Sequence, residues 1–241
     1  MNWLEVWTRK GLDASSPDVD PLEAALALDG FGSVNDSALP VSTMLDFAAH
    51  VLDVVAPRDG DSLYEVGCGS GAFLGAIDRV RPRLLLGGCD YTATLVAACH
   101  RLFPQVDSEV REAVDLPLEP SVTHVVSFGV FHYFPDLGYA STVVGRMCAK
   151  SQVSVSILDV PDLALRSDAE DFRRGQLSEG EYDARYAGLG HLYYDGGWLA
   201  GQFPADEWSV SVERQRMEGY LNTPFRYNVF AHRRTPSRKV P

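Results

Sequence analysis

The sequence predicts an α/β protein with a seven-stranded, mostly parallel sheet, an antiparallel last strand and helices on both faces. A short apolar run ends in a glycine-rich turn at residues 62–71, and a helical pattern follows at once. Further apolar runs alternate with helical patterns as far as residue 159, and two alternating segments close the chain. Strand signals that alternate with helix signals are typical of a parallel sheet covered by helices.

Length and composition indicate one globular domain and limit its partners. The chain has 241 residues, of which 46% are hydrophobic and 22% charged, as in ordinary globular domains. The net charge of −12 argues against a nucleic-acid partner, because phosphate binding needs a basic face. No apolar run has the length of a membrane span and the N-terminus has no signal pattern, so we expect no membrane partner and a cytoplasmic location. Four scattered cysteines predict neither a zinc site nor disulfides.

The N-terminal residues 1–58 are predicted to form a helical cover ahead of the first strand. Trp3 and Trp7 share one helical face, and they form either a hydrophobic staple onto the core or a lid over the site. A helical pattern breaks at residues 30–32. A second helix over residues 41–55 carries an apolar stripe that is expected to cover the sheet.

Residues 62–71 are the stretch around which the chain is organised. They read Ser-Leu-Tyr-Glu-Val-Gly-Cys-Gly-Ser-Gly. The glycines allow a tight turn and close approach of a ligand, and the following helix presents unpaired N–H groups at its start. Glu65 ends an otherwise apolar strand, where a carboxylate costs free energy unless it has a partner. A ligand with a cationic or N–H-donating group beside the turn would supply that partner.

A second acid, Asp90, follows another apolar run nineteen residues after Gly71. In a β-α-β unit such an acid lies at the tip of the neighbouring strand, within reach of a ribose diol. Ligands of open α/β sheets bind at the carboxyl ends of the strands. We therefore expect Glu65, Asp90, Phe128 and Asp159 to line one edge, since each ends a predicted strand. The parallel strands are predicted near residues 62–66, 84–90, 106–111, 123–128 and 153–159, and the terminal pair at 208–213 and 225–231.

Glu65, Gly67, Gly69 and Gly71 complete a D/E-x-G-x-G-x-G pattern. With Asp90 downstream, the chain resembles the class I S-adenosylmethionine (SAM)-dependent methyltransferases over about residues 60–232. The resemblance implies a Rossmann-like fold, SAM as cofactor and S-adenosylhomocysteine (SAH) as product. It places Glu65 near the amino end of the methionine moiety and Asp90 on the ribose. The other cofactor contacts, expected from the resemblance or from position, are Trp7, Cys68, Tyr91, Glu112, Ala113, Val114, Ser127, Phe128 and Phe131.

The resemblance also divides the chain and suggests its chemistry. A single methyltransferase domain would consist of an N-terminal helical lid or cover (1–58), a SAM-binding half (59–159), a substrate cap (160–206), a terminal β-hairpin (207–232) and a tail (233–241). We expect metal-independent N- or O-methylation of a small molecule by in-line transfer, in which alignment and a positioned base lower the barrier. The first candidate for the base is His132, beside Tyr133. His191 and Tyr194 are the second.

The aromatic residues near these positions suit an amine or an aromatic substrate, and the high arginine usage suggests specialised metabolism. No acidic pair has convincing metal-ligand spacing, although Asp159 and Asp162 keep a magnesium-dependent mechanism open. An NAD-dependent oxidoreductase would fit the glycine pattern but predicts an apolar residue in place of Glu65. A SAM-fold binding or scaffold protein, or a SAM-fold enzyme of non-methylating chemistry, stays open. A homodimer is compatible with the sequence, which fixes no oligomeric state.

Overall fold

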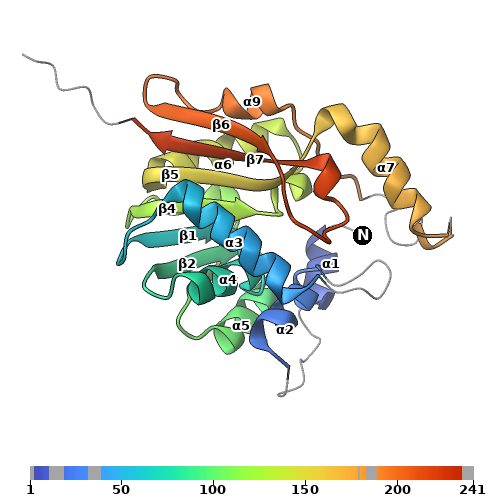
Figure 1. Cartoon of the computed structure of the whole chain (residues 1–241), viewed down its shortest axis with the longest axis horizontal. Coiled ribbons are helices and arrows are strands. Elements are labelled where there is room, and N and C mark those ends of the chain that lie inside the picture. Colours follow the sequence, from blue (N-terminus) through green and yellow to red (C-terminus); the bar gives the residue numbers. More distant parts are fainter. Residues whose placement is uncertain (1–2, 11–18, 32–38, 179, 183–188, 235–241) are drawn as a thin grey trace, which may run out of the picture.

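A computed structural model describes residues 3–10, 19–31, 39–178, 180–182 and 189–234, and it contains a single seven-stranded sheet (Figure 1). The strand order is β3-β2-β1-β4-β5-β7-β6. Neighbours among the first five strands run parallel, and β7 runs antiparallel to both β5 and β6. The predicted fold class is therefore confirmed. The strands are β1 (Ser62–Val66), β2 (Leu85–Asp90), β3 (Asp107–Val110), β4 (Val122–Phe128), β5 (Ser151–Pro161), β6 (Trp208–Arg214) and β7 (Arg226–Arg233).

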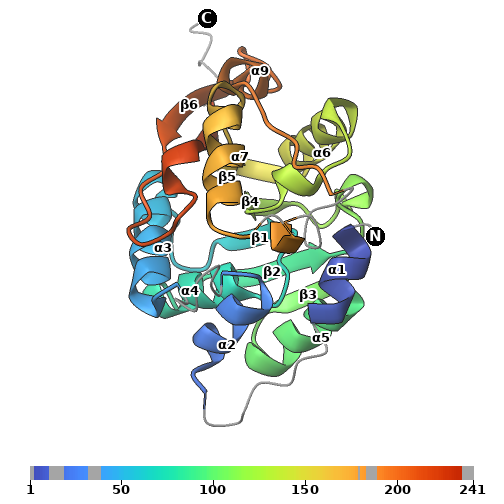
Figure 2. The same ribbon diagram turned by 90° about the vertical axis from the view of Figure 1, so that its right-hand side faces the viewer.

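Helices cover both faces of the sheet and bury an apolar core on each (Figure 2). On one face, α3 (Val41–Val55) and α4 (Ala72–Val80) pack with α5 (Ala93–Leu102), and the apolar stripe predicted on α3 is buried. On the other face, α6 (Leu137–Lys150) and the short α9 (Gly196–Ala200) pack over β4, β5 and β7. Burying apolar side chains on both faces is the main stabilising contribution in such a layered fold.

The N-terminal helices lie at one end of the molecule, against α5 (Figures 1 and 2). Helix α1 spans Trp3–Lys10 and α2 spans Pro21–Leu28. Asp20 caps α2, because its carboxylate accepts a hydrogen bond from the backbone N–H of Leu22 at 2.8 Å. Helix α2 also contacts α4, so this part of the chain covers the helix that follows the glycine turn.

Two predicted boundaries shift. Strand β5 continues to Pro161, beyond the expected end at Asp159, and the first helix of the cap is α7 (Arg166–Gly175). The tail was expected from residue 233, but Arg233 ends β7 and the Arg234 N–H donates to the carbonyl of Glu207 at 2.6 Å. Part of the predicted cap (179 and 183–188) and residues 235–241 lie outside the described residues. No helix among those described is both long and apolar enough to cross a membrane.

Candidate active site

The glycine turn between β1 and α4 has a backbone that only glycine adopts easily. Gly67, Gly69 and Gly71 have φ values of +80°, +52° and +87°, in the left-handed region that disfavours side chains. Space is also limiting. A Cβ on Gly67 would overlap the Val130 side chain, and one on Gly69 would lie 2.5 Å from Oδ1 of Asp29. The turn thus brings bare backbone to the carboxyl edge of the sheet.

Two predicted cofactor residues, Glu65 and Asp90, lie buried beside this turn. The Glu65 side chain is 2% exposed, and its Oε2 has no hydrogen-bond partner among the described residues. Burial raises the pKa of Glu65 well above its usual value, and the charges of Asp29 and Asp90 raise it further. Asp90 accepts backbone hydrogen bonds from Gly69 (3.1 Å) and Thr92 (2.8 Å). Ionisation of buried carboxyl groups this close together is costly unless a cationic partner balances their charge.

Asp29 is a third carboxylate at the turn, which the sequence interpretation missed. It lies one residue after α2, and its carboxylate accepts hydrogen bonds from the N–H groups of Ser70 (2.7 Å) and Ala72 (3.3 Å). These donors lie at the start of α4, where a negative charge is favoured. Burial nevertheless raises the pKa of Asp29 to about 7. In the sequence, Asp29 stands before a glycine at the end of a helix, which is a common way for a helix to end. Nothing in this local pattern indicates a contact between Asp29 and Ser70.

The predicted cofactor residues Trp7 and Tyr91 belong to one small apolar cluster. Trp7 is 8% exposed and packs with Leu28, Leu95 and Ala98, and Tyr91 is partly buried against the same group. Trp7 also approaches Tyr133, with ring centroids 5.4 Å apart. The two interpretations of the tryptophans therefore combine: Trp7 is a core residue of a helix that also lies beside the predicted site.

The predicted cofactor contacts Glu112, Ala113 and Val114 follow β3, and Ala113 begins a 3-10 turn (Ala113–Asp115). The N–H of Arg111 donates to the Asp90 carbonyl at 2.8 Å, which fixes this segment next to β2. Ala113 and Val114 pack at the border of the core, while Glu112 is exposed and accepts a hydrogen bond from the Tyr139 hydroxyl at 3.0 Å. The segment therefore lies at the carboxyl end of β3, next to the end of β2.

The candidate base His132 lies in a cluster of aromatic rings. It is in a 3-10 turn after β4 (Phe131–Tyr133), and its ring centroid is 4.0 Å from that of Tyr133 and 5.0 Å from that of His191. Trp3 stacks on His191 at 5.1 Å, with an interplanar angle of 17°, and its Nε1 donates to the carbonyl of Gly190 at 3.2 Å. Three predicted catalytic residues and the first tryptophan are thus brought together.

The surroundings of both imidazoles of this cluster disfavour their protonated forms. Burial lowers the pKa of His132 well below its usual value, and the charges of Arg226 and Arg173 lower it further. The same causes lower the pKa of His191, with Arg173 the stronger of the two charges. Nδ1 of His132 is buried and has no hydrogen-bond partner in the described part of the chain. A neutral imidazole whose ring nitrogen has no hydrogen-bond partner can accept a proton.

Tyr194, the other residue of the second candidate pair, lies in the core beneath this cluster. Its side chain is fully buried, and its hydroxyl donates to the carbonyl oxygen of Phe131 at 2.7 Å. The tyrosine therefore supports the turn that carries His132, and its catalytic role stays a prediction. Phe131, a predicted cofactor contact, is 1% exposed and packs on Phe134 and Tyr194 in the core.

Three further predicted cofactor residues are core residues by their side chains. Phe128 stacks on Phe31 at 5.2 Å and also packs against other rings of the α3–α4 face. Cys68 is buried in the same core, and a hydrogen bond with Cys99 raises the pKa of its thiol. Ser127 is fully buried within β4, and its Oγ has no partner among the described residues. Their strand ends still form the edge of the site.

Asp159, predicted to share this edge, is held in a buried polar network. Its φ of +59° is a strained value for a residue with a side chain. Its carboxylate accepts hydrogen bonds from Nε2 of Gln215 (3.0 Å) and the Tyr220 hydroxyl (3.1 Å), and Arg226 Nε lies 3.6 Å from Oδ1. Asp162 instead pairs with Arg214 at 2.7 Å. These two carboxylates therefore do not form a joint metal site, and the described residues contain no other group that could hold a metal ion.

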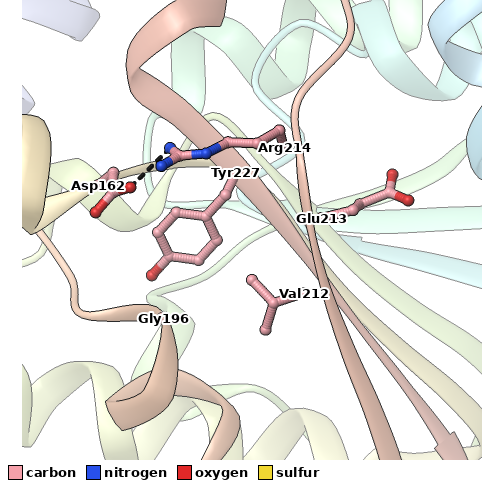
Figure 3. A pocket seen from close by; sticks show the side chains of 6 residues that line it. All are labelled: Asp162, Gly196, Val212, Glu213, Arg214 and Tyr227. Atoms are coloured by element: carbon pink, nitrogen blue, oxygen red, sulfur yellow. Dashed lines mark hydrogen bonds and ion pairs between the residues drawn. The ribbon is translucent and has the colours of Figure 1, made fainter.

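A hollow also lies between β6, β7 and the start of α9 (Figure 3). The Asp162–Arg214 ion pair crosses one side of it, and the Tyr227 ring faces it (Figure 3). None of the predicted site residues lines this hollow, and Arg214 is largely exposed. The residues that line it are Asp162, Gly196, Val212, Glu213, Arg214 and Tyr227.

Comparisons with known proteins agree with this geometry. A family model described as a methyltransferase domain matches residues 64–152, which run from β1 into β5. A comparison with curated protein sequences found no match. Among solved structures, magnesium protoporphyrin IX methyltransferase from Synechocystis PCC 6803, with bound SAH, is similar at 13% identity over 96% of this chain and 93% of that one, with a TM-score of 0.59.

Two other solved structures are similar over nearly their full length. The plantazolicin methyltransferase in complex with a triazolic desmethyl analogue and SAH is 11% identical to this chain. The alignment covers 96% of this chain and 98% of the plantazolicin methyltransferase, with a TM-score of 0.65. A chain from the complex of the Haloferax volcanii Trm112 methyltransferase activator with a putative methyltransferase has 13% identity, coverage of 97% and 98%, and a TM-score of 0.65. At such identities the likeness establishes the fold.

Proposed function

We propose that the protein transfers a methyl group from SAM to a small molecule without a metal ion. The match of residues 64–152 to a methyltransferase-domain model and the likeness of the fold to methyltransferase structures support this proposal. One observation carries the proposal above all. Glu65 buries a carboxylate oxygen with no partner among the described residues, next to the glycine turn and two further carboxylates. A ligand that brings positive charge to this edge satisfies it.

The residues present fit SAM. Its ammonium and sulfonium groups are cations, and Glu65 with Asp29 would hold the charge that burial makes costly. Asp90 uses its carboxylate oxygens to accept two backbone hydrogen bonds, and each oxygen keeps acceptor capacity for a ribose hydroxyl. Gly69 would let the cofactor approach the backbone closely. When bound, SAM supplies a methyl group activated by the sulfonium.

Residues of the chain would remove the proton of the acceptor, exclude water and align the two reactants. His132, whose buried Nδ1 has no hydrogen-bond partner among the described residues, would take the proton of the acceptor atom. His191 is the second candidate, and its ring centroid lies 5.0 Å from that of His132. Trp3 and Tyr133 pack against these rings and would keep water from them. Holding donor and acceptor in line can contribute several kcal/mol, on the order of 7–11 in favourable cases.

Calorimetric titration with SAH and, separately, with NAD tests the proposal. We expect saturable binding of SAH and none of NAD. Glu65→Gln should weaken SAH binding about tenfold or more, which is roughly 1.4 kcal/mol. Glu119→Gln is the matched control, because Glu119 is exposed and precedes β4 at the opposite edge of the sheet. Binding of NAD alone would contradict the proposal, and SAH binding without turnover of any acceptor would favour the binding-protein alternative.

A further inference from the structure

Every backbone N–H group of residues 67–72, which form the glycine turn and the start of α4, donates to an acceptor within the protein. Three of them donate to carbonyl groups. Gly67 and Cys68 donate to the carbonyl of Cys89, at 2.7 and 2.9 Å. Gly71 donates to the carbonyl of Cys68 at 2.8 Å. Buried N–H groups need acceptors, and the backbone of the turn and of β2 supplies them for these three.

The other three N–H groups donate to carboxylates. Gly69 donates to Asp90 at 3.1 Å. Ser70 and Ala72 donate to Asp29, at 2.7 and 3.3 Å. Ala72 is the first residue of α4, so the Asp29 carboxylate lies at the start of this helix, where an anion is favoured.

Asp29 also fills the space beside the second glycine of the turn. Residues 67–72 match the pattern G-x-G-x-x-G/A of dinucleotide-binding proteins. In those proteins the second glycine lets the pyrophosphate approach the backbone, and the start of the helix binds it. In this chain a Cβ on Gly69 would lie 2.5 Å from Oδ1 of Asp29. The carboxylate therefore takes both the space and the N–H groups that a phosphate would use.

Helix α2 holds the Asp29 carboxylate in this position. Asp29 directly follows α2, and its N–H donates to the carbonyl of Ala25 at 2.9 Å. The Ser70 hydroxyl donates to the same carbonyl at 3.1 Å. The end of α2 and the glycine turn are thus connected through the backbone of Ala25 as well as through the carboxylate.

We propose that Asp29 determines the class of cofactor, because its carboxylate excludes phosphate from the glycine turn and leaves a site for an adenosine cofactor without phosphate groups. The inference rests on the proposed SAM site, and it gives the N-terminal cover a part in the choice of cofactor. SAM and SAH contain adenosine and no phosphate, whereas NAD contains a pyrophosphate. A phosphate at the turn would meet N–H groups that already have acceptors and the negative charges of Asp29 and Asp90.

Three matched competitors of SAH test this inference: adenosine, AMP and ADP, which share the nucleoside and differ in their phosphate groups. Displacement of SAH from the full chain is measured by calorimetry at about pH 8, where Asp29, with its pKa of about 7, is mostly ionised. We expect AMP and ADP to bind the wild type at least about tenfold more weakly than adenosine. In Asp29→Ala this ratio should fall about tenfold, because two N–H groups at the start of α4 lose their acceptor and a negative charge is removed.

Two further variants separate the causes. Asparagine at Asp29 keeps the shape and an oxygen that can accept from Ser70 but removes the charge, so the ratio should fall less than with alanine. Asp136→Ala is the matched control. Asp136 caps α6 by accepting from the N–H of Tyr139 at 2.8 Å, so alanine also removes an acceptor from the start of a helix, on the other face of the sheet. The ratio should keep its wild-type value in this variant.

The outcomes separate this inference from the proposed function. If neither SAH nor adenosine binds the wild type, the proposed SAM site is wrong. If SAH binds and AMP binds as tightly as adenosine, or if the ratio is unchanged in the Asp29 variants, the role assigned to Asp29 is wrong. A general loss of affinity cancels, because the competitors are compared within each variant. Should Asp29→Ala fail to fold, Asp29→Asn decides the matter: an unchanged ratio in that variant overturns the inference.

Discussion

The carboxylate of Asp29 accepts a hydrogen bond of 2.7 Å from the backbone N–H of Ser70, 41 residues further along the chain. Ser70 returns a second connection, because its hydroxyl donates to the carbonyl of Ala25 in α2 at 3.1 Å. The N-terminal cover and the glycine turn are therefore joined directly. A substitution at the end of α2 should therefore alter the conformation of the glycine turn, which we propose holds the cofactor.

Replacement of Asp29 by asparagine should change the pH dependence of stability. The folded-state pKa of Asp29 is raised from 3.8 to about 7 by burial. Its contribution to stability is thus complete below the unfolded pKa and is lost as the pH rises through about 7. Asparagine does not ionise, so the Asp29→Asn variant does not lose this contribution. Its free energy of unfolding minus that of the wild type should therefore increase between about pH 4 and pH 8, by up to roughly 4 kcal/mol.

Urea unfolding of the ligand-free protein at several pH values measures this difference. Asp20→Asn serves as the control, because the hydrogen bond from Arg79 lowers the pKa of Asp20. Its contribution is lost only as the pH falls below the usual carboxyl range, so its difference from the wild type should stay constant above about pH 5. A constant difference for Asp29→Asn over the same range would mean that Asp29 is ionised throughout.

Alanine at Gly69 should damage both the fold and the cofactor site. The φ of +52° disfavours a side chain, and the new Cβ would lie 2.5 Å from Oδ1 of Asp29. We expect a loss of about 1–3 kcal/mol in the free energy of unfolding and weaker binding of SAH. Gly145→Ala in α6 is the matched control, since no atom lies within 4 Å of its new Cβ, and it should stabilise by about 0.5–1 kcal/mol. Equal effects of the two substitutions would contradict the packing described for the turn.

Phenylalanine at Tyr194 tests the structural role assigned to its hydroxyl. The substitution removes a buried hydrogen bond of 2.7 Å to the Phe131 carbonyl. We expect thermal or denaturant unfolding to show a loss of about 1–1.5 kcal/mol, because a buried hydrogen bond is lost while the Phe131 carbonyl keeps the bond from the Phe134 N–H at 3.2 Å. Tyr139→Phe, which removes an exposed bond to Glu112, should cost less than about 1 kcal/mol. If Tyr194→Phe left stability unchanged and abolished methyl transfer, the predicted catalytic role would be supported in place of the structural one.

The sequence predicted the site residues that directly follow regular strands. The glycine turn, Glu65 and Asp90 follow strands whose apolar runs fix their direction, so their common edge could be predicted from topology alone. The Asp29 contact could not be predicted, because it joins positions 41 residues apart and an acid at a helix end has local explanations. Contacts between distant segments depend on packing that no local pattern encodes.

The directions of the side chains in the turn after β4 could not be predicted from the sequence either. Phe131, His132 and Tyr133 form a single 3-10 turn, and such a turn sends successive side chains in different directions. Phe131 enters the core while Tyr133 contacts Trp3 and Trp7. Three aromatic residues in a short loop show no periodicity from which these directions could be chosen. The sequence analysis could therefore name Phe131 as a cofactor contact and His132 as a candidate base, but it could not predict which of these side chains enters the core.

The protonation of His132 gives the last prediction, and it needs no knowledge of the substrate. Burial, with the charges of Arg226 and Arg173, holds its pKa well below the usual value, so the folded protein should keep this imidazole neutral as the pH falls from 8 to 6. Nitrogen-detected NMR of the ring measures this, with the urea-unfolded chain, which titrates near pH 6.5, as reference. A lowered pKa means that the stability contribution is present above the unfolded pKa and is lost as the pH falls below it. His132→Gln should therefore become less destabilised, relative to the wild type, in acid. Protonation of His132 in the folded protein near pH 6.5 would show that the ring is open to solvent, and the proposed base would lose its dry environment.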